Sequence, residues 1–302
     1  MKKIIILVLM LLCLVACGQK QQEEEKVDEV ISYKIVTPSG APALALLDYV
    51  NDENMTIDVV DGSDVLQAEF SNGNADIIIA PINLGAKLAS ATGNYKLAAV
   101  ITWGNLHLVS TLPLEEAKKY PVAAFGEQAV PGKVLNYLSE ELDGFTFEWF
   151  NGVNEAASAL MSEQYASAVL AEPVLTMART KGAQEYNEIV DIQEVYKQKT
   201  GYDSYPQAAM FVSVKTLENA ETLNTFLNNI AISINNYNHD KDLLSERIEK
   251  TAMGQIGFAN AEFIKDAYSR MALNYKSAVI CKEEIKAFLN IFGMELDESI
   301  IY

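Results

Sequence analysis

Cysteine and histidine are scarce in this chain of 302 residues, which holds three cysteines and two histidines. Cys13 and Cys17 lie in an apolar stretch at the N-terminus, so only Cys281 belongs to the body of the chain. Disulfide frameworks and cysteine-based zinc sites need several clustered cysteines, and both are therefore excluded. His107 and His239 are too few for a histidine-rich metal site, and they give little material for a Ser-His-Asp set.

Positive charge is the second scarcity, because 23 Lys and Arg stand against 41 Asp and Glu, for a formal net charge of −18. Nucleic-acid binders need clustered Lys and Arg, so the sequence excludes a nucleic-acid partner. The sequence also lacks GxSxG, HExxH and Walker motifs. We therefore expect a protein that is not an enzyme, with no catalytic residue, no metal and no cofactor.

The N-terminus has the pattern of an export signal. Lys2 and Lys3 precede an apolar run over residues 4–16, which is shorter than the roughly 20 residues that span a membrane and is typical of a signal peptide. The run ends in Leu14-Val15-Ala16-Cys17, which resembles the bacterial lipoprotein box. The resemblance implies a signal peptide over 1–16, a Cys17 that carries lipid (palmitate included), and attachment to the outer face of the cell membrane. The alternative is an ordinary cleaved signal with an incidental cysteine.

Residues 18–29 have one apolar residue in twelve, so we expect a flexible tether over 17–30. The folded part then begins near Ile31. From there, short apolar runs alternate with segments of helical period, which predicts a mainly parallel α/β sheet covered on both faces. We expect strands at 33–37, 55–60, 75–80, 96–102, 121–125, 145–150, 166–171 and 207–214. We expect helices at 43–50, 65–71, 83–90, 131–142, 153–164, 173–181, and only helices beyond Leu217, with one of them at 261–275.

Four features coincide in this chain: the lipoprotein box, the loop at 38–42, the strand at 74–80 and the junction Ala171-Glu172-Pro173. Together they resemble the solute-binding lipoproteins of ABC importers, in the branch of nitrate, sulfonate, taurine and thiamine-pyrimidine receptors. The resemblance implies an α/β, two-lobed type 2 periplasmic-binding-protein fold with two hinge crossings and a helical C-terminal segment. Lobe I would comprise 31–106 and 208–302, and lobe II 107–207. It also implies a monomer that passes a small-molecule ligand to a permease and ATPase complex.

Ligands of open α/β sheets bind beyond the carboxyl ends of the strands, where turns present backbone N–H groups. Ten residues of such turns and of the crossings are candidate ligand contacts: Ser39, Gly40, Ala41, Ser63, Asn83, Trp103, Asn105, Gln128, Glu172 and Tyr205. Each also has a structural interpretation, as a helix cap, as packing beneath the hinge, or as a carboxylate at a helix N-terminus. His107 is interpreted as a structural histidine.

The charges of these residues favour one class of ligand. The three arginines, Arg179, Arg247 and Arg270, fall within or after predicted helices and not in cleft loops. The loops carry hydroxyls, amides, aromatics and one carboxylate, Glu172, and the acidic chain slows the approach of anions. We therefore expect a neutral or cationic planar nitrogen heterocycle, such as a thiamine-precursor pyrimidine. The alternatives are a small anion such as a sulfonate or nitrate, the receptor subunit of a sensor, and an enzyme on the same fold.

Overall fold

The structure is a computed structural model that describes residues 31–60, 62–258 and 261–302. The predicted signal peptide, the tether and Cys17 lie outside the described residues. Residues 31–302 form one compact unit. Within the described part of the chain, no helix combines the length and the apolar character needed to cross a membrane.

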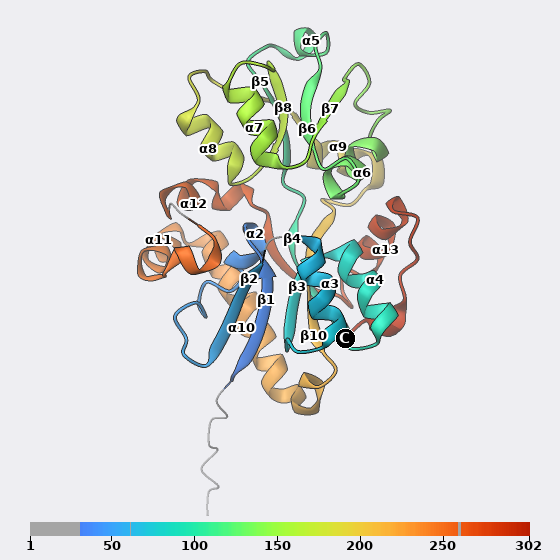
Figure 1. Cartoon of the computed structure of the whole chain (residues 1–302), viewed down its shortest axis with the longest axis vertical. Helices are drawn as coiled ribbons and strands as arrows, with labels where there is room; N and C mark the ends of the chain where they lie inside the picture. Colours follow the sequence, from blue (N-terminus) through green and yellow to red (C-terminus); the bar gives the residue numbers. More distant parts are fainter. Residues whose placement is uncertain (1–30, 61, 259–260) are drawn as a thin grey trace, which may run out of the picture. The chain divides into compact units, whose positions relative to one another are not determined.

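The first sheet has six strands in the order β11-β4-β10-β3-β1-β2 (Figure 1). Its strands are β1 (Tyr33–Pro38), β2 (Met55–Val60), β3 (Ile77–Pro81), β4 (Tyr95–Trp103), β10 (Pro206–Ser213) and β11 (Leu273–Ser277). β1 runs parallel to β2 and β3, whereas β10 lies antiparallel between β3 and β4.

Helices cover both faces of this sheet, which explains why the sequence of β3 is apolar throughout. Ile78 and Ala80 pack into the core beneath α3 (Ser63–Asn72), α4 (Ile82–Thr92) and α13 (Lys282–Ile291). Ile77 and Ile79 pack into the core on the other face, with α2 (Ala41–Leu44), α10 (Ala220–His239), α11 (Lys241–Lys250) and α12 (Ala261–Ala267). Successive residues of a strand point to opposite faces, so a strand buried on both sides needs no polar alternation.

The second sheet has five strands in the order β7-β6-β8-β5-β9. The strands are β5 (Leu106–Ser110), β6 (Val122–Phe125), β7 (Phe147–Phe150), β8 (Ser167–Ala171) and β9 (Asn187–Asp191). The helices of this part are α5 (Leu114–Ala117), α6 (Val130–Tyr137), α7 (Val153–Met161), α8 (Val174–Lys181) and α9 (Ile192–Thr200). We call the part with the six-stranded sheet lobe I and the part with the five-stranded sheet lobe II.

The chain passes between the lobes twice, from β4 to β5 and from α9 to β10 (Figure 1). The two crossings touch, since the backbone N–H of Gly104 donates to the carbonyl oxygen of Tyr205 at 2.9 Å. A Cβ atom at Gly104 would lie 2.5 Å from the Tyr205 ring, so glycine is required for this close approach. The expected two-lobed α/β fold with two hinge crossings is thus confirmed. The expectation of mainly parallel sheets was wrong, because β10 runs antiparallel to β3 and β4, and β5 runs antiparallel to β8 and β9.

Several local expectations were wrong. Beyond Leu217 the chain is not only helical, because β11 adds a strand to the edge of the first sheet, and the helix expected over 261–275 ends at Ala267. The helix expected over 43–50 covers only Ala41–Leu44 and continues as turns. β9 and α9 were not expected. β11 holds Asn, Lys and Ser and forms by pairing with β4, about 170 residues away in sequence, so its own residues give little sign of it.

The remaining elements are the 3₁₀ helices η1 (Thr216–Asn219), η2 (Met253–Ile256), η3 (Tyr268–Arg270) and η4 (Glu298–Ile300).

Candidate functional site

Four buried polar atoms without a hydrogen-bond partner among the described residues lie on segments that meet around the crossings. They are Asn83 Oδ1, Asn105 Oδ1, His107 Nε2 and Gln207 Oε1. Asn83 follows β3 at the start of α4, and Gln207 precedes Ala208, which pairs with Pro81 of β3. Asn105 lies in the first crossing, and His107 lies two residues further on in β5.

A buried donor or acceptor without a partner lowers the stability of the fold by about 1–3 kcal/mol, because it has lost its hydrogen bonds to water. Native proteins contain few such atoms, and a bound water, ion or ligand is a common explanation. The other three in the described residues are on Glu69 in α3, on Tyr186 between α8 and β9, and on Tyr268 in η3. The four atoms around the crossings therefore mark the place where a bound molecule can supply missing hydrogen bonds.

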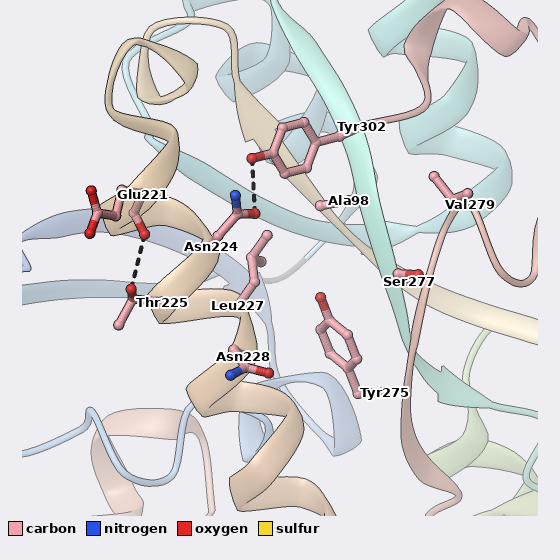
Figure 2. Close-up of a pocket in the computed structure, with 10 residues that line it drawn as sticks. All are labelled: Ala98, Glu221, Asn224, Thr225, Leu227, Asn228, Tyr275, Ser277, Val279 and Tyr302. Carbon is pink, nitrogen blue, oxygen red and sulfur yellow. Dashed lines mark hydrogen bonds between the residues drawn. The ribbon is translucent and has the colours of Figure 1, made fainter.

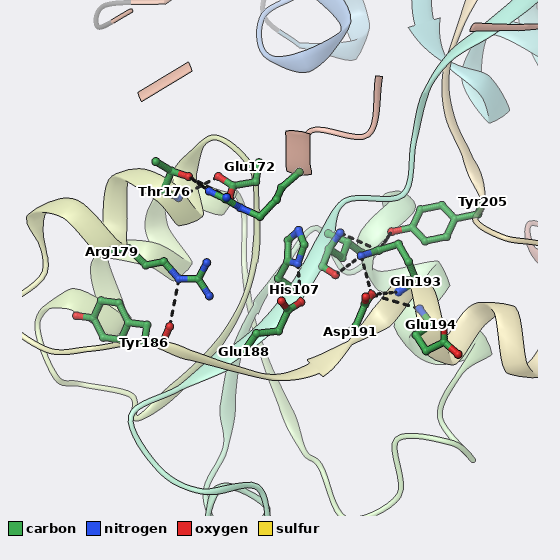
Figure 3. Close-up of polar contacts among 12 residues, drawn as sticks. His107, Glu172, Thr176, Arg179, Tyr186, Glu188, Asp191, Gln193, Glu194 and Tyr205 are labelled. Atoms are coloured by element: carbon green, nitrogen blue, oxygen red, sulfur yellow. Dashed lines mark hydrogen bonds and ion pairs between the residues drawn. The ribbon is translucent and has the colours of Figure 1, made fainter. Parts of the chain in front are cut away.

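His107 is held in a fixed orientation. Its Nδ1 lies 2.6 Å from Glu188 Oε1, and the residue is 7% exposed, so Nε2 is the ring atom left for another contact (Figure 3). Burial acts to raise the pKa of the Glu188 carboxyl, but the hydrogen bond with His107 and the charges of His107, Arg179 and Arg270 outweigh it. The pKa of Glu188 is therefore lowered from its usual value.

Glu172, between β8 and α8, has a side chain with no exposed surface and accepts three hydrogen bonds. The backbone N–H of Thr176 donates to Oε2 at 2.9 Å, and the Thr176 hydroxyl donates to Oε1 at 3.0 Å (Figure 3). Arg270 Nε donates to Oε1 at 2.7 Å, and Arg270 Nη2 donates to the Thr176 hydroxyl at 2.6 Å. Because Arg270 belongs to η3 of lobe I, this ion pair joins the two lobes.

The expectation that all three arginines avoid the cleft loops is therefore wrong for Arg270. It does not lie in a long helix. It lies in the 3₁₀ turn just before β11, and Leu273 of β11 pairs with Thr102 near the end of β4. This pairing brings Arg270 to the boundary of the lobes, where it neutralises Glu172.

The two aromatic candidates of the crossings are packed inside the protein. Trp103 is 4% exposed; its Nε1 donates to the Asn274 carbonyl oxygen at 2.8 Å, and Lys276 Nζ lies 4.4 Å from its ring centroid. Tyr205 has no exposed surface, and its ring stacks on Phe288 with centroids 5.5 Å apart and planes at 13°. A ligand can stack on either ring only if these neighbours move.

The other predicted contacts lie further apart. Ser39, Gly40 and Ala41 form the turn between β1 and α2, and Gly40 needs its φ of +93° there. A Cβ at Gly257 would lie 3.0 Å from Ser39, so that turn sits against η2 and its following loop. Ser63 is exposed at the start of α3, and Gln128 is exposed beside Lys133. Of the ten candidates, the structure brings Asn83, Trp103, Asn105, Glu172 and Tyr205 to the crossings.

Sequence reasoning missed His107, Gln207, Thr176 and Arg270 as members of this site. His107 and Gln207 carried a usable signal, since each is a polar side chain beside or within an apolar strand sequence (LHLV and QAAMFV). Gln193 was also missed: its Oε1 accepts from the Leu106 N–H at 3.0 Å and its Nε2 donates to the Leu106 carbonyl at 2.9 Å, so it fixes the first crossing (Figure 3).

One cavity has walls from both lobes. Its volume is about 230 Å³, and its lining comprises Pro173, Val174, Met177 and Lys181 of lobe II and Gly257, Phe258, Phe263 and Ile264 of lobe I. A larger hollow of about 770 Å³ lies within lobe I between α10, β11 and the C-terminus, where Tyr302 donates to Asn224 (Figure 2). None of the ten candidates lines that larger hollow, and the four buried polar atoms lie elsewhere.

No family model matches this chain, and no curated protein sequence matches it. Solved structures share its fold. An ABC transporter protein of Parabacteroides distasonis is 22% identical, covering 90% of this chain and 98% of its own, with a TM-score of 0.75. The periplasmic aliphatic sulphonate binding protein of Escherichia coli is 10% identical over 90% and 92%, with a TM-score of 0.64. The periplasmic nitrate-binding protein of Synechocystis PCC 6803 is 11% identical over 87% and 81%, with a TM-score of 0.56.

These likenesses extend over nearly all of the described residues and over most of each matched chain. At such low identity they concern the fold, and they agree with the resemblance seen in the sequence. The described part of this chain has the two-lobed fold of the periplasmic solute-binding proteins of ABC importers.

Proposed function

We propose that this protein is the extracytoplasmic solute-binding lipoprotein of an ABC importer, which captures a small molecule between its lobes and delivers it to a permease and ATPase. The observation that carries the proposal is the set of four partnerless buried polar atoms around the crossings. In this fold, a solute held there contacts both lobes and the segments between them. The lobes extend over 31–106 with 208–302 and over 107–207, and lipid at Cys17 attaches the monomer to the outer face of the membrane.

The charges around these atoms support a neutral or cationic nitrogen heterocycle as the solute. Glu172 is paired with Arg270 and His107 with Glu188, and three of the four partnerless atoms are amide oxygens, on Asn83, Asn105 and Gln207. Asn105 Nδ2 donates to the Glu172 carbonyl at 3.5 Å, which leaves its oxygen as the free end. A free amide oxygen accepts hydrogen bonds, and a ligand with N–H groups satisfies it, whereas an anion does not.

A small anion such as a sulfonate is the second candidate, because of Arg270. Its side chain is 36% exposed at the lobe boundary, and guanidinium groups bind oxyanions well. Two of its five N–H groups are already given to Glu172 and Thr176, however, and the buried carboxylate offsets its charge. The pairing supports the neutral or cationic class over the anion.

The test is calorimetric titration of residues 31–302, preceded by native mass spectrometry to detect retained solute. We expect binding of aminopyrimidines and weaker or no binding of taurine and nitrate. Asn105→Leu should lower the affinity about tenfold or more, since it leaves ligand N–H groups without an acceptor. Asn228→Leu, in the larger hollow of lobe I, is the matched control and should leave the affinity unchanged.

The outcomes separate the two parts of the proposal. Tight binding of taurine without any response to aminopyrimidines would overturn the ligand class and leave the receptor assignment intact. Equal loss of affinity in the Asn228 variant, or none in the Asn105 variant, would remove the crossings as the binding site.

A further inference from the structure

The cavity of about 230 Å³ between the lobes lies at one side of the polar site. Pro173 and Val174 begin one wall directly after Glu172, and Met177 follows Thr176 in α8. The opposite wall, with Phe258 and others, belongs to lobe I. A group that fills this cavity touches both lobes at once, so it stabilises the arrangement in which they are together.

The cavity has the chemistry of a ring-binding site. Seven of its eight lining residues have no charge, and Phe258 and Phe263 supply aromatic surface. Lys181 Nζ lies 5.5 Å from the centroid of the Phe263 ring, a cation–π contact that helps to hold this ring in the wall. Aromatic rings attract one another in edge or offset-stacked geometry, so these two side chains favour a planar ring as the occupant.

The volume of the cavity limits the size of the group that it can bind. An apolar cavity of about 150 Å³ takes up benzene, so about 230 Å³ admits one substituted six-membered ring. Trp103 and Tyr205, the rings of the crossings, are covered by Lys276 and Phe288 and offer no such open face. Phe258 and Phe263, in contrast, line a cavity that can take a planar ring without first displacing packed side chains.

We infer that this cavity binds the ring of the solute, and that the solute is an amphipathic molecule with a planar heteroaromatic ring and a polar substituent. The substituent faces the side of Glu172, where Asn105, whose Nδ2 donates to the Glu172 carbonyl oxygen, leaves its Oδ1 to accept a hydrogen bond. The inference rests on the proposed function and names the class of its solute.

The first test follows the methyl group of Met177 by NMR in residues 31–302 carrying ¹³C-methyl methionine. We expect 4-amino-2-methylpyrimidine to shift the Met177 methyl resonance through its ring current, while Met161 at the end of α7 stays in place. Acetamidine, which has the same N–C–N unit without the ring, should leave the Met177 resonance unchanged. Met177→Leu assigns the signal.

The second test fills the cavity. Val174→Phe should lower the affinity for 4-amino-2-methylpyrimidine at least about tenfold, which corresponds to about 1.4 kcal/mol. The matched control is Val279→Phe, because Val279 is 63% exposed and lines the other hollow. Circular dichroism verifies that both variants are folded, and the Met177 measurement on the unsubstituted protein stands if Val174→Phe does not fold.

The outcomes distinguish this inference from the proposed function. Pyrimidine binding that leaves Met177 unmoved, or that Val174→Phe does not weaken, would overturn the ring site while the receptor assignment stands. A retained solute without a ring, found by native mass spectrometry, would do the same. A retained ring compound that Val174→Phe fails to retain would support the inference even if 4-amino-2-methylpyrimidine itself does not bind. A protein that binds no small molecule would overturn both.

Discussion

Arg270→Gln offers the sharpest test of how the two lobes are held together. Glu172 is completely enclosed and receives its one charged hydrogen bond from Arg270, at 2.7 Å. Removing one partner of a buried ion pair usually costs about 3–5 kcal/mol, because the remaining charge is left uncompensated. Here the charge lies at the boundary of the lobes, and separating them lets water reach it.

We therefore expect most of the cost to appear as lobe opening and only a small part as loss of folding stability. A hydrogen bond to a charged group contributes about 1.5–3 kcal/mol. A loss of that size shifts the ratio of open to closed protein about tenfold to 150-fold. Small-angle scattering of residues 31–302 without solute should give a larger radius of gyration for Arg270→Gln. A saturating solute should restore the smaller value, since closure gains its contacts.

Arg247→Gln is the matched control, because Arg247 pairs with Asp48 at 2.8 Å inside lobe I. That variant should lower the free energy of unfolding, measured in urea, and leave the radius of gyration unchanged. The double variant Glu172→Gln with Arg270→Gln should recover much of the closed form, since no buried charge remains. If Arg270→Gln lowers the free energy of unfolding by about 3–5 kcal/mol without any expansion, the pair stabilises the fold and does not control the lobes.

Three further predictions concern other parts of the chain. Gly85→Ala should lower the free energy of unfolding by about 1–3 kcal/mol in urea titration, because a Cβ there lies 2.1 Å from the Phe211 ring; unchanged stability would mean that this ring can shift. Because the pKa of Glu188 is lowered in the folded protein, its carboxylate adds folding stability above pH 4.5, and this stability is lost as the pH falls through the folded pKa. Glu188→Gln should therefore make the free energy of unfolding depend less on pH in the acid range. An unchanged pH dependence in that range would contradict this. Cys17→Ser should release the protein into the medium or leave an unprocessed precursor, and a membrane-bound product of unchanged processed mass on mass spectrometry would refute lipidation.

The sequence was sufficient for the α/β class because the buried strands are apolar throughout. The run from Ile77 to Ala80 is short and follows the turn residues Asn72-Gly73-Asn74, which predicts a buried strand, and the structure buries all four residues. β9 and β11 were missed because Asn187–Asp191 and Leu273–Ser277 are short and largely polar, and they become strands only against β5 and β4.

The site was harder to predict than the fold, because it depends on contacts between distant segments. Asn83, Asn105 and Glu172 could be found since each follows the end of a strand. Arg270 could not, because 98 residues separate it from Glu172 and only the β11–β4 pairing brings it there. Trp103 and Tyr205 were placed correctly along the chain, but whether an aromatic ring is open or covered depends on neighbours such as Phe288 that sequence spacing does not reveal.

The order of the strands in the first sheet has a consequence for the synthesis of the protein. β4 forms its hydrogen bonds with β10 and β11, and Tyr302, the last residue, donates its N–H to the Leu97 carbonyl oxygen at 3.0 Å. The five-stranded sheet, in contrast, is built from the single stretch 106–191. Its strands are all present while the ribosome is still making the remainder, so it can fold first, whereas the six-stranded sheet cannot be completed until translation has ended. β1, β2 and β3 can pair with one another early, but β4 has no strand partner until β10 and β11 have been made, so the middle of the six-stranded sheet is the last part to form.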